Sequence, residues 1–256
     1  NYYGYGTAVT TVPNGNFVYV WSKWRNIGSA TVYEIEYTLL DHAGNTVRAP
    51  GKLTNHSGAV VNTYDYYPSV AVAPNGTIGI AWYRYLYNYN TFQYNYNIYF
   101  ATMDSAGNLT SGPTNLTNNV VWGSTSPRFY SPTIAASDDN RFMLSWEKYL
   151  GAPSYTNDIW YAVRNTAGGS VFSPTALTSN NISYAPVLNS LSGGKSILTW
   201  LDAGTPTYAV LNSSGTVSKP ATVLVASNTY NEPADAVLLP NGKVAKDEVV
   251  TGARWA

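Results

Sequence analysis

The chain has 256 residues and balances 14 Lys and Arg against 14 Asp and Glu, so that only 11% of its residues are charged. A net charge of zero argues against nucleic acid or acidic membranes as partners, because phosphate binding needs a basic surface. The absence of Cys excludes disulfides, thiol catalysis and thiolate metal sites. No stretch of 18 apolar residues occurs, so the sequence predicts no membrane span.

The polar residues are mostly Asn, Thr, Ser and Tyr, and Tyr alone reaches 23 copies. This composition is typical of an exported surface protein, and a start at Asn1 without Met is consistent with removal of a leader. We therefore expect an extracellular or cell-surface location, with a shortened cytosolic protein as the alternative. Six N-x-S/T sequons are candidate N-glycosylation sites: Asn55, Asn75, Asn108, Asn115, Asn181 and Asn212.

A long internal repeat runs through the chain. A Pro, or in the first copy a Thr, stands fourteen residues before a Trp in four places. The pairs are Thr7 and Trp21, Pro68 and Trp82, Pro132 and Trp146, and Pro186 and Trp200. The intervals between successive Trp residues are 61, 64 and 54 residues, and such a period predicts one structural unit stacked several times.

Each copy opens with a predicted β-hairpin. In the first copy the apolar pair Ala8-Val9 precedes the turn Pro13-Asn14-Gly15, and Phe17, Tyr19 and Trp21 alternate after it. Asn-Gly supplies the positive φ of a tight hairpin, and alternation of aromatic or β-branched residues predicts a strand. The later copies repeat the pattern around turns at 74–76, 138–140 and 192–194. Small or apolar residues on the other face predict a strand that is buried on both sides.

A second predicted hairpin follows, with a turn that begins at Asp or Asn and ends at Gly. These turns are 41–44, 104–107, 165–168 and 212–215. The Asp or Asn side chain caps the turn, and Gly takes the left-handed position. An aromatic residue stands seven residues before each Gly: Tyr37, Phe100, Tyr161 and Tyr208. A Leu-Thr pair closes a fourth strand in three copies: Leu53-Thr54, Leu116-Thr117 and Leu177-Thr178.

Four antiparallel strands in roughly 50–60 residues predict the blade of a β-propeller, in which sheets pack radially and bury both faces. No segment has a sustained helical period, so helix should be nearly absent. A β-sandwich is the rival fold, but sandwich domains run nearer 100 residues. We predict one all-β domain over residues 1–256, most simply five-bladed. Its units are about 1–63, 64–127, 128–182 and 183–230, with a partial unit at 231–256.

The last unit restarts the pattern and then departs from it. Pro233 and the turn Pro240-Asn241-Gly242 repeat earlier features, but an acidic residue stands where the spacing demands Trp. An unpaired buried charge is costly, so this strand cannot occupy the same buried place. An incomplete blade would expose strand edges, and open edges recruit other strands. The candidate assembly-edge residues are Lys246, Asp247, Glu248, Val249 and Val250.

Three segments carry a family resemblance: Tyr67-Pro68-Ser69-Val70-Ala71-Val72 with Ile80-Ala81-Trp82, Tyr130-Ser131-Pro132-Thr133-Ile134, and Asp158-Ile159-Trp160-Tyr161-Ala162-Val163-Arg164-Asn165. With them the whole chain resembles the propeller repeats of secreted bacterial and archaeal proteins, broadly the sialidase-like group. The resemblance implies a β-propeller. That family marks the turn between third and fourth strands with an Asp box, roughly S-x-D-x-G-x-x-W. Here the turn reads Asp-x-x-Gly, one residue longer and without Trp, which argues against an inherited sialidase activity.

Catalytic groups are scarce in the sequence. A glycosidase needs two carboxylates across a cleft, and four acidic residues lie near predicted blade rims. They are Glu147, Asp158, Asp202 and Glu232. Solubility and turn capping are the competing interpretation of these side chains. Two His residues cannot build a metal site alone, so the sequence predicts no catalytic residue, no metal site and no cofactor.

Basic residues recur two places after the Trp, at Lys23, Arg84 and Lys148. They could line one face of the propeller with positive charge. The alternative is that this position simply marks where the second strand emerges into water.

The most unusual segment is an insertion in the second unit, residues 83–99. Its aromatic residues are Tyr83, Tyr85, Tyr87, Tyr89, Phe92, Tyr94, Tyr96 and Tyr99. Alternation places rings on one face of an extended hairpin, and Tyr suits protein interfaces and sugar stacking. The alternative is a Tyr ladder that packs on its own blade. A second cluster comprises Tyr2, Tyr3, Tyr5, Tyr64, Tyr66 and Tyr67.

These features favour a non-enzymatic, extracellular structural or adhesive module that self-assembles or docks on a cell surface, by strand addition at the incomplete blade. The expected partners are copies of the chain, another surface protein or glycans. Two other functions stay open. One is a lectin-like carbohydrate-binding module that uses residues 83–99, and the other is a sialidase-like glycoside hydrolase.

Overall fold

The computed structural model describes residues 6–151, 153–224, 236–238 and 244–246, and every regular element in them is a β-strand. The first two units contain β1 (Thr7–Thr11), β2 (Phe17–Ile27), β3 (Ala30–Leu40), β4 (Thr46–Lys52), β5 (Asn62–Val72), β6 (Ile78–Asn88), β7 (Gln93–Met103) and β8 (Leu109–Asn115). The next two contain β9 (Arg128–Ala136), β10 (Arg141–Leu150), β11 (Thr156–Asn165), β12 (Ser170–Ala176), β13 (Ser183–Leu191), β14 (Lys195–Asp202), β15 (Thr205–Asn212) and β16 (Val217–Val223). A short hairpin follows, β17 (Ala236–Leu238) and β18 (Val244–Lys246).

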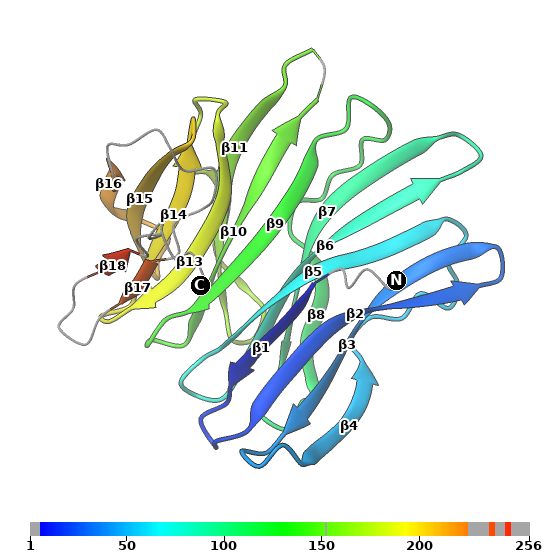
Figure 1. Cartoon of the computed structure of the whole chain (residues 1–256), viewed down its shortest axis with the longest axis horizontal. Coiled ribbons are helices and arrows are strands. Elements are labelled where there is room, and N and C mark those ends of the chain that lie inside the picture. The colour runs from blue at the N-terminus through cyan, green and yellow to red at the C-terminus, as the bar shows by residue number, and fades with distance from the viewer. Residues whose placement is uncertain (1–5, 152, 225–235, 239–243, 247–256) are drawn as a thin grey trace, which may run out of the picture.

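Within each of the four units, four antiparallel strands pair in chain order, and a short parallel pairing of β3 with β5 joins the first two units into one eight-stranded sheet. We call the four units blades 1 to 4. Figure 1 shows them as a fan in which β1, β5, β9 and β13 lie side by side, with the later strands of each blade leading outward. The prediction of an all-β fold built from four-stranded antiparallel blades is confirmed. The described residues do not form a closed ring, so the five-bladed count and the single-domain boundaries stay predictions.

The Pro of the repeat lies in a β-bulge directly opposite the Trp. Tyr66 pairs with Tyr83 and Ser69 with Ala81, so that Tyr67 and Pro68 together oppose Trp82. The same shift in register occurs between β9 and β10 and between β13 and β14. Pro has no N–H to donate to a ladder, and a bulge is one of the few sheet positions that tolerate it. The fixed Pro-to-Trp spacing therefore records one repeated bulge.

The residue before each of these Pro residues has a left-handed backbone. The φ angles are +49° at Tyr67, +49° at Ser131 and +55° at Ala185, and Gly6 has +91° at the matching place in blade 1. Such values strain a residue with a side chain, by about 1–3 kcal/mol each. A Cβ at Gly6 would also lie only 2.7 Å from Tyr67 Cα, so Gly is required there. Three strained residues and Gly6 thus occupy matching places along the inner strands.

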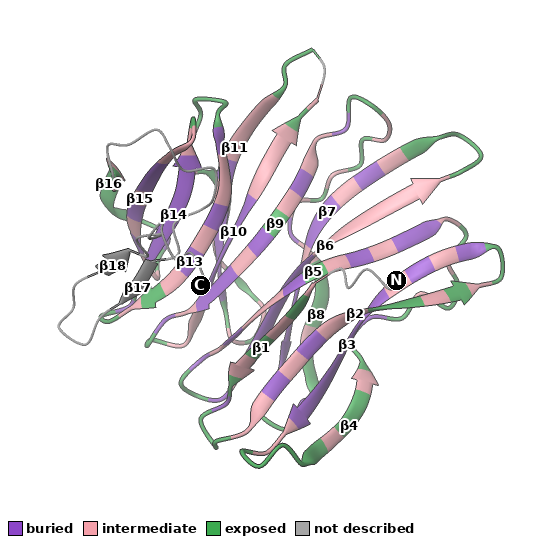
Figure 2. Ribbon diagram, viewed as in Figure 1, coloured by how far each residue is buried: buried purple, intermediate pink, exposed green. Residues whose placement is uncertain are grey.

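The core lies between successive blades. Trp82, Trp146 and Trp200 are at most 1% exposed, and each belongs to an apolar cluster shared with the blade before its own. Figure 2 shows the buried residues concentrated in the middle strands, whereas β4 and the turns are exposed. We call the side of a blade that carries this Trp its tryptophan face. The predicted burial of both strand faces is confirmed in β6, where Ile78 to Trp82 are all buried.

The predicted Asp-x-x-Gly turns have the expected structure. In blade 2, Asp104 Oδ1 accepts the N–H groups of Ala106 and Asn108 at 3.0 and 2.8 Å, and Gly107 has a φ of +82°. In blades 1 and 3, the Tyr seven places before Gly donates a hydrogen bond to the turn of the following blade. The Tyr37 hydroxyl donates to Gly107 O at 2.7 Å. The seven-residue spacing between the aromatic residue and Gly therefore reflects contacts between blades as well as the turn within a blade.

The Leu-Thr pairs fasten the chain as it leaves each outer strand. Leu53 N–H donates to Ile35 O at 2.8 Å, and Thr54 Oγ1 accepts Ile35 N–H at 2.9 Å. The same two bonds join Leu116 and Thr117 to Ile98, and Leu177 and Thr178 to Ile159. These bonds fix the start of the loops 53–61, 116–127 and 177–182, which return the chain to the inner strands.

The last hairpin forms as predicted, with Ala236 opposite Lys246 and Leu238 opposite Val244. Its side chains, together with Asp247, Glu248, Val249 and Val250, lie outside the described residues, so their predicted role at an open edge stays a prediction. Glu232 and the N-terminal Tyr2, Tyr3 and Tyr5 also lie outside them. The described residues include no helix long and apolar enough to cross a membrane.

Candidate functional site

The candidate site lies at the end of the blades where the inner strands begin. The loops 53–61, 116–127 and 177–182 and the tips of the β2–β3, β6–β7, β10–β11 and β14–β15 hairpins gather at this end. We call it the loop face. The short Asn-Gly and Asp-x-x-Gly turns lie at the opposite end. Loops carried on a rigid scaffold are the usual place for binding residues.

A pocket of about 670 Å³ opens where the three Pro-containing bulges meet the start of β1. Tyr67, Tyr83 and Tyr130 contribute rings to its wall, and Glu147 contributes a carboxyl group. The remaining lining is small or apolar: Gly6, Thr7, Ala8, Pro68, Ser69, Ser131, Pro132, Thr133 and Pro186. The bulges that explain the Pro-to-Trp spacing therefore also shape this central pocket.

Among the described residues, Glu147 is the one acidic residue that lines the central pocket. Its Oε1 accepts Ala185 N–H at 2.8 Å. Burial raises the pKa of Glu147 above its ordinary value, while hydrogen bonds from Ala185 and Ser131 offset part of that effect. A carboxyl group in this setting can accept a hydrogen bond from a ligand hydroxyl or, when protonated, donate one.

Tyrosine rings continue from the pocket along blade 2. Tyr85 pairs with Tyr96 and Tyr87 with Tyr94, so these rings share one face of the β6–β7 hairpin. The Tyr85 and Tyr96 ring centroids lie 4.7 Å apart. The tyrosine surface comprises Tyr33, Tyr64, Tyr66, Tyr67, Tyr83, Tyr85, Tyr87, Tyr89, Tyr94, Tyr96 and Tyr130, each in ring contact with another member.

Two residues of the predicted aromatic platform lie elsewhere. Tyr99 is on the other face of the hairpin, where its ring stacks on Trp82 at 5.9 Å. Phe92 is exposed at the hairpin tip with a φ of +54°. Burial raises the pKa of Tyr64 to about 12, with further contributions from neighbouring Tyr hydroxyls such as that of Tyr89. The Tyr64 hydroxyl is therefore a neutral hydrogen-bonding group at ordinary pH.

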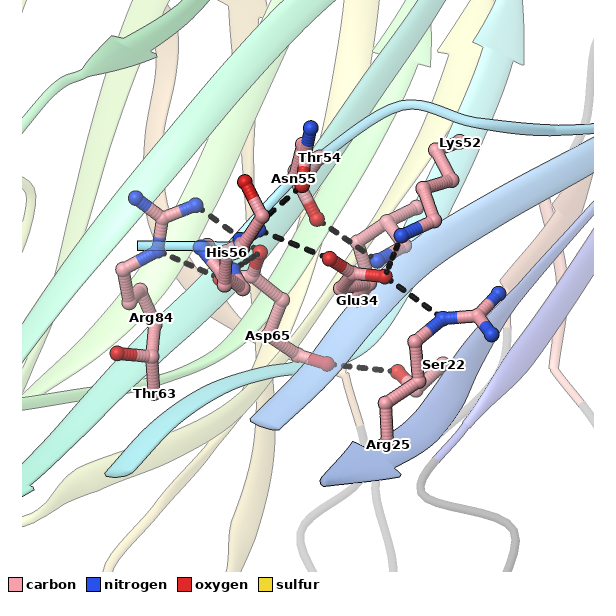
Figure 3. Close-up of polar contacts among 12 residues, drawn as sticks. Ser22, Arg25, Glu34, Lys52, Thr54, Asn55, His56, Thr63, Asp65 and Arg84 are labelled. Atoms are coloured by element: carbon pink, nitrogen blue, oxygen red, sulfur yellow. Dashed lines mark hydrogen bonds and ion pairs between the residues drawn. The ribbon is translucent and has the colours of Figure 1, made fainter. Parts of the chain in front are cut away.

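A buried ionic cluster lies between blades 1 and 2 (Figure 3). Asp65 is fully buried and accepts Arg84 Nε–H at 2.7 Å and Arg84 Nη2–H at 2.9 Å. His56 Nε2 lies 2.7 Å from Asp65 Oδ2. Burial alone would raise the pKa of Asp65, but the Arg84 charge and the His56 hydrogen bond outweigh it and lower that pKa. The Arg84 guanidinium also covers the Tyr99 ring, 4.1 Å from its centroid.

Glu34 extends the cluster and anchors the loop 53–61. Its carboxylate accepts Arg25 Nε–H at 2.8 Å, Lys52 Nζ–H at 2.7 Å and His56 backbone N–H at 2.8 Å. Burial would raise the pKa of Glu34, but these donors lower it overall. A second acid, Glu36, pairs with the same Arg25.

In two further blades, the residue equivalent to Glu34 also accepts a backbone N–H from the loop that follows the outer strand. Asn97 Oδ1 accepts Asn119 N–H at 2.7 Å, and Asp158 Oδ1 accepts Asn181 N–H at 3.1 Å. Asp158, one of the predicted rim carboxylates, therefore holds the loop 177–182. The Asp65–Arg84–His56 group has no such counterpart, because Phe129 and Ser183 occupy the place of Asp65 in the next two blades.

The cluster forms the floor of a smaller cavity. This cavity has a volume of about 350 Å³ and is lined by Asn55, His56, Gly58, Ala59, Thr63, Arg84, Leu86 and Tyr99. Neither Lys23, Arg84 nor Lys148 lines the central pocket. Lys148 Nζ instead lies 4.5 Å from the Trp160 ring centroid. The three basic residues therefore do not surround one binding site.

Other predicted residues are placed apart from the central pocket. Asp202 Oδ1 accepts Asn180 Nδ2–H at 2.6 Å at the end of β14. Four sequon residues are exposed: Asn55, Asn75, Asn108 and Asn181. Asn115 and Asn212 are half-buried, and each side chain caps a turn by accepting a backbone N–H. Within the described part of the chain, no group of three or more His, Cys, Asp and Glu residues is placed to hold a metal ion.

Sequence reasoning missed Asp65 and Glu34, which are both fully buried. A signal was present in both cases, since each acid stands between apolar or aromatic residues, as in Tyr64-Asp65-Tyr66 and Tyr33-Glu34-Ile35. A charged residue at such a position must have a partner, because an unpaired buried charge is costly. The partners Arg84 and His56 lie in other strands and loops, so spacing alone does not identify them.

No protein-family model and no curated protein sequence matches the chain. Solved structures match most of it. The Hadza microbial sialidase Hz136 aligns with a TM-score of 0.59 and 13% identity over 87% of this chain and 46% of its own. Polysaccharide lyase Uly1 aligns with a TM-score of 0.60 and 9% identity over 91% of this chain and 52% of its own. The Penicillium chrysogenum α-L-arabinanase complexed with arabinobiose aligns with a TM-score of 0.56 and 14% identity over 94% of this chain and 72% of its own.

The chain spans about half the length of the sialidase and the lyase, 46% and 52% respectively. At these identities the likeness concerns the fold alone. It confirms the resemblance inferred from the repeat, because the structural neighbours include sialidases and an arabinanase with propeller-type folds. The chain shares a propeller-type fold with these structures.

Proposed function

We propose that this protein binds carbohydrate in the central pocket of the loop face. The observation that carries the proposal is that three Tyr rings and one half-buried carboxyl group line the same pocket of about 670 Å³. Aromatic rings offer flat apolar area to the C–H face of a sugar, and Tyr adds a hydroxyl for its polar edge. Ligand pockets of about 300–1,000 Å³ with a few convergent polar groups are typical of small-molecule sites.

The structural neighbours support a carbohydrate ligand. Their names include a sialidase, polysaccharide lyases and an arabinanase complexed with arabinobiose. The tyrosine surface offers further rings beyond the central pocket, where a longer chain of sugars could lie. Tyr67 is 50% exposed and stacks on Tyr83 with centroids 5.9 Å apart, so it stands at the junction of pocket and surface.

Binding accounts for the pocket better than hydrolysis does. A glycoside hydrolase of the usual kind places two carboxylates about 5–10 Å apart. The described lining of the central pocket holds one, Glu147. Asp158, proposed from sequence as a second candidate, is engaged in anchoring a loop. Incubation with a panel of glycosides tests this preference, and turnover abolished by Glu147→Gln would overturn it.

A glycan array followed by titration of the best ligand tests the binding proposal. The Tyr67→Ala variant should weaken binding by about tenfold or more, the cost expected of a central aromatic contact. Tyr155→Ala is a matched control, because Tyr155 is also an exposed Tyr with a left-handed φ of +47° and does not line the pocket. Equal losses in both variants, or an array without ligands, would count against the proposal.

Assembly on a surface, through the edge residues Lys246 to Val250, is a second proposal. The β17–β18 hairpin supports it, because its two short strands pair with no other described strand, and an unpaired strand edge can accept another strand. An extracellular location belongs to the same proposal. Imaging of the chain with and without residues 233–256 tests it, since assembly unchanged by the deletion would exclude that edge as the contact.

A further inference from the structure

The smaller cavity, of about 350 Å³, is a site separate from the central pocket. It is bounded by the loop 53–61 and by β5, β6 and β7, and the described residues that line it are all different from those of the central pocket. Asn55 and Gly58 are exposed at its rim, whereas the His56 and Arg84 side chains at its floor are only 9% and 16% exposed. A cavity of this size suits a small molecule.

Two side chains at the floor are held in fixed directions by Asp65. Although burial acts to raise it, the pKa of Asp65 is lowered by Arg84 and His56, so Asp65 is an ionised acceptor. His56 Nε2 must therefore donate the 2.7 Å bond to Asp65, and its Nδ1 has no hydrogen-bond partner among the described residues. Asp65 also accepts Nε–H and Nη2–H of Arg84, and Figure 3 shows the remaining nitrogen, Nη1, pointing away from Asp65.

The ion pairs around the cavity are already balanced without a charge on His56. They comprise three acids, Asp65, Glu34 and Glu36, and three bases, Arg84, Arg25 and Lys52. The remaining titratable residue of the described lining is Tyr99, whose ring lies under the Arg84 guanidinium. An anion that entered alone would be a partly buried charge without a counterion, which is costly. A proton on His56 Nδ1 would supply both the missing positive charge and a further N–H donor.

This balance and the polar wall together define the ligand. One proton compensates one negative charge, and a carboxylate is a monoanion whose two oxygens accept charge-assisted hydrogen bonds. The wall adds the Asn55 amide, whose Oδ1 accepts Ser57 N–H, and Thr63 Oγ1, which donates to Val61 O and keeps its acceptor capacity. These groups suit hydroxyls on the same ligand. We propose that the smaller cavity binds a small hydroxylated carboxylate, such as a sugar acid, and that His56 takes up one proton with it.

Titration calorimetry with D-glucuronate tests the proposal, with D-glucose as the uncharged control. We expect glucose to bind at least about tenfold more weakly, because it lacks the charged acceptor. Titrations in buffers with different heats of ionisation should show uptake of about one proton per glucuronate, and the affinity should fall about tenfold per pH unit above the pH at which free His56 titrates. The absence of glucuronate binding, equal affinity for glucose, or binding without proton uptake would each overturn the proposal.

The two His residues of the chain provide a matched pair of variants. His56→Gln keeps an N–H donor for Asp65 but cannot take up a proton, so glucuronate binding should lose its pH dependence and weaken about tenfold or more in acid. His42→Gln should bind like the wild type, because His42 is exposed in the turn 41–44. Tyr67→Ala should also leave this binding unchanged, since Tyr67 lines only the central pocket of the two. Loss in either control, or unchanged binding in His56→Gln, would contradict the assignment.

Nitrogen NMR of the wild-type imidazoles gives an answer that does not depend on the variants folding. The free protein above the titration of His56 should show that ring with a proton on Nε2 alone. Saturation with glucuronate at the same pH should add a proton at Nδ1, while the His42 signals stay unchanged. A His56 ring that remains singly protonated in the saturated protein would overturn the proposal.

Discussion

Replacing Tyr37 by Phe isolates one bond between two blades. The Tyr37 side chain is buried, and its hydroxyl donates to Gly107 O at 2.7 Å across the interface of blades 1 and 2. Phe keeps the ring and removes only the donor. The protein already uses Phe at this position in blade 2, where Phe100 packs on Phe142 with centroids 5.7 Å apart. The substitution is therefore compatible with the fold.

The expected loss of stability comes from the buried Gly107 carbonyl oxygen, which loses its hydrogen-bond donor. A typical hydrogen bond contributes about 1 kcal/mol net, and a buried acceptor that loses its donor costs about 1–3 kcal/mol. We expect Tyr37→Phe to lower the free energy of unfolding by about 1.5 kcal/mol. For a protein of this size each kcal/mol shifts the Tm by about 2–4 °C, so the Tm should fall by about 3–6 °C.

Thermal unfolding followed by circular dichroism measures this shift, with two further variants for comparison. Tyr161→Phe should behave like Tyr37→Phe, because Tyr161 makes the same bond to Gly215 O at 2.8 Å. Tyr208→Phe should change the Tm by less than about 1–2 °C, because its hydroxyl contacts the exposed Lys219 instead of a turn carbonyl. A loss at Tyr208 as large as that at Tyr37, or no loss at Tyr37, would refute the reasoning.

Two further substitutions test other parts of the core. Asp65→Asn leaves the Arg84 guanidinium without its buried counterion and should lower the free energy of unfolding by about 3–5 kcal/mol at neutral pH. Because the pKa of Asp65 lies below its ordinary 3.8, its contribution is complete above that value and disappears as the pH falls through the lower folded pKa. Denaturation series should therefore show wild type and variant converging in acid, and a constant difference would contradict this. Gly79→Ala places a Cβ 2.7–2.9 Å from the Phe142 ring and should cost about 1–3 kcal/mol. Gly58→Ala, with no atom within 4 Å of its Cβ, should be neutral in the same melts.

The repeat predicted the blades because its residues serve both the local backbone conformation and the packing between blades. Pro68 tolerates a bulge without an N–H, and Trp82 fills the space between two blades opposite that bulge. Both requirements recur in blades 3 and 4, so they leave a periodic record in the sequence. The Asp-x-x-Gly turns are equally local, since one carboxylate and one left-handed Gly define them.

The candidate site was less accessible to sequence because it depends on the order and register of blades. Arg84, His56 and Asp65 come from two strands and a loop, and only the packing of blade 2 on blade 1 brings them together. Alternation also assigned Tyr99 to the wrong face. Tyr94 and Tyr96 share a face by parity, whereas Tyr99, an odd number of residues further along, points to the other side. Glu147 was proposed as a rim carboxylate, and it lines the central pocket.

The position of a bound oligosaccharide tests the central claim most directly. A crystal structure of the protein with the best ligand from the array should show a sugar ring in the pocket between Tyr67 and Tyr130, with a hydroxyl within hydrogen-bonding distance of the Glu147 carboxyl group. A ligand bound away from this pocket, or a clear pocket in crystals grown at saturating ligand, would contradict the account.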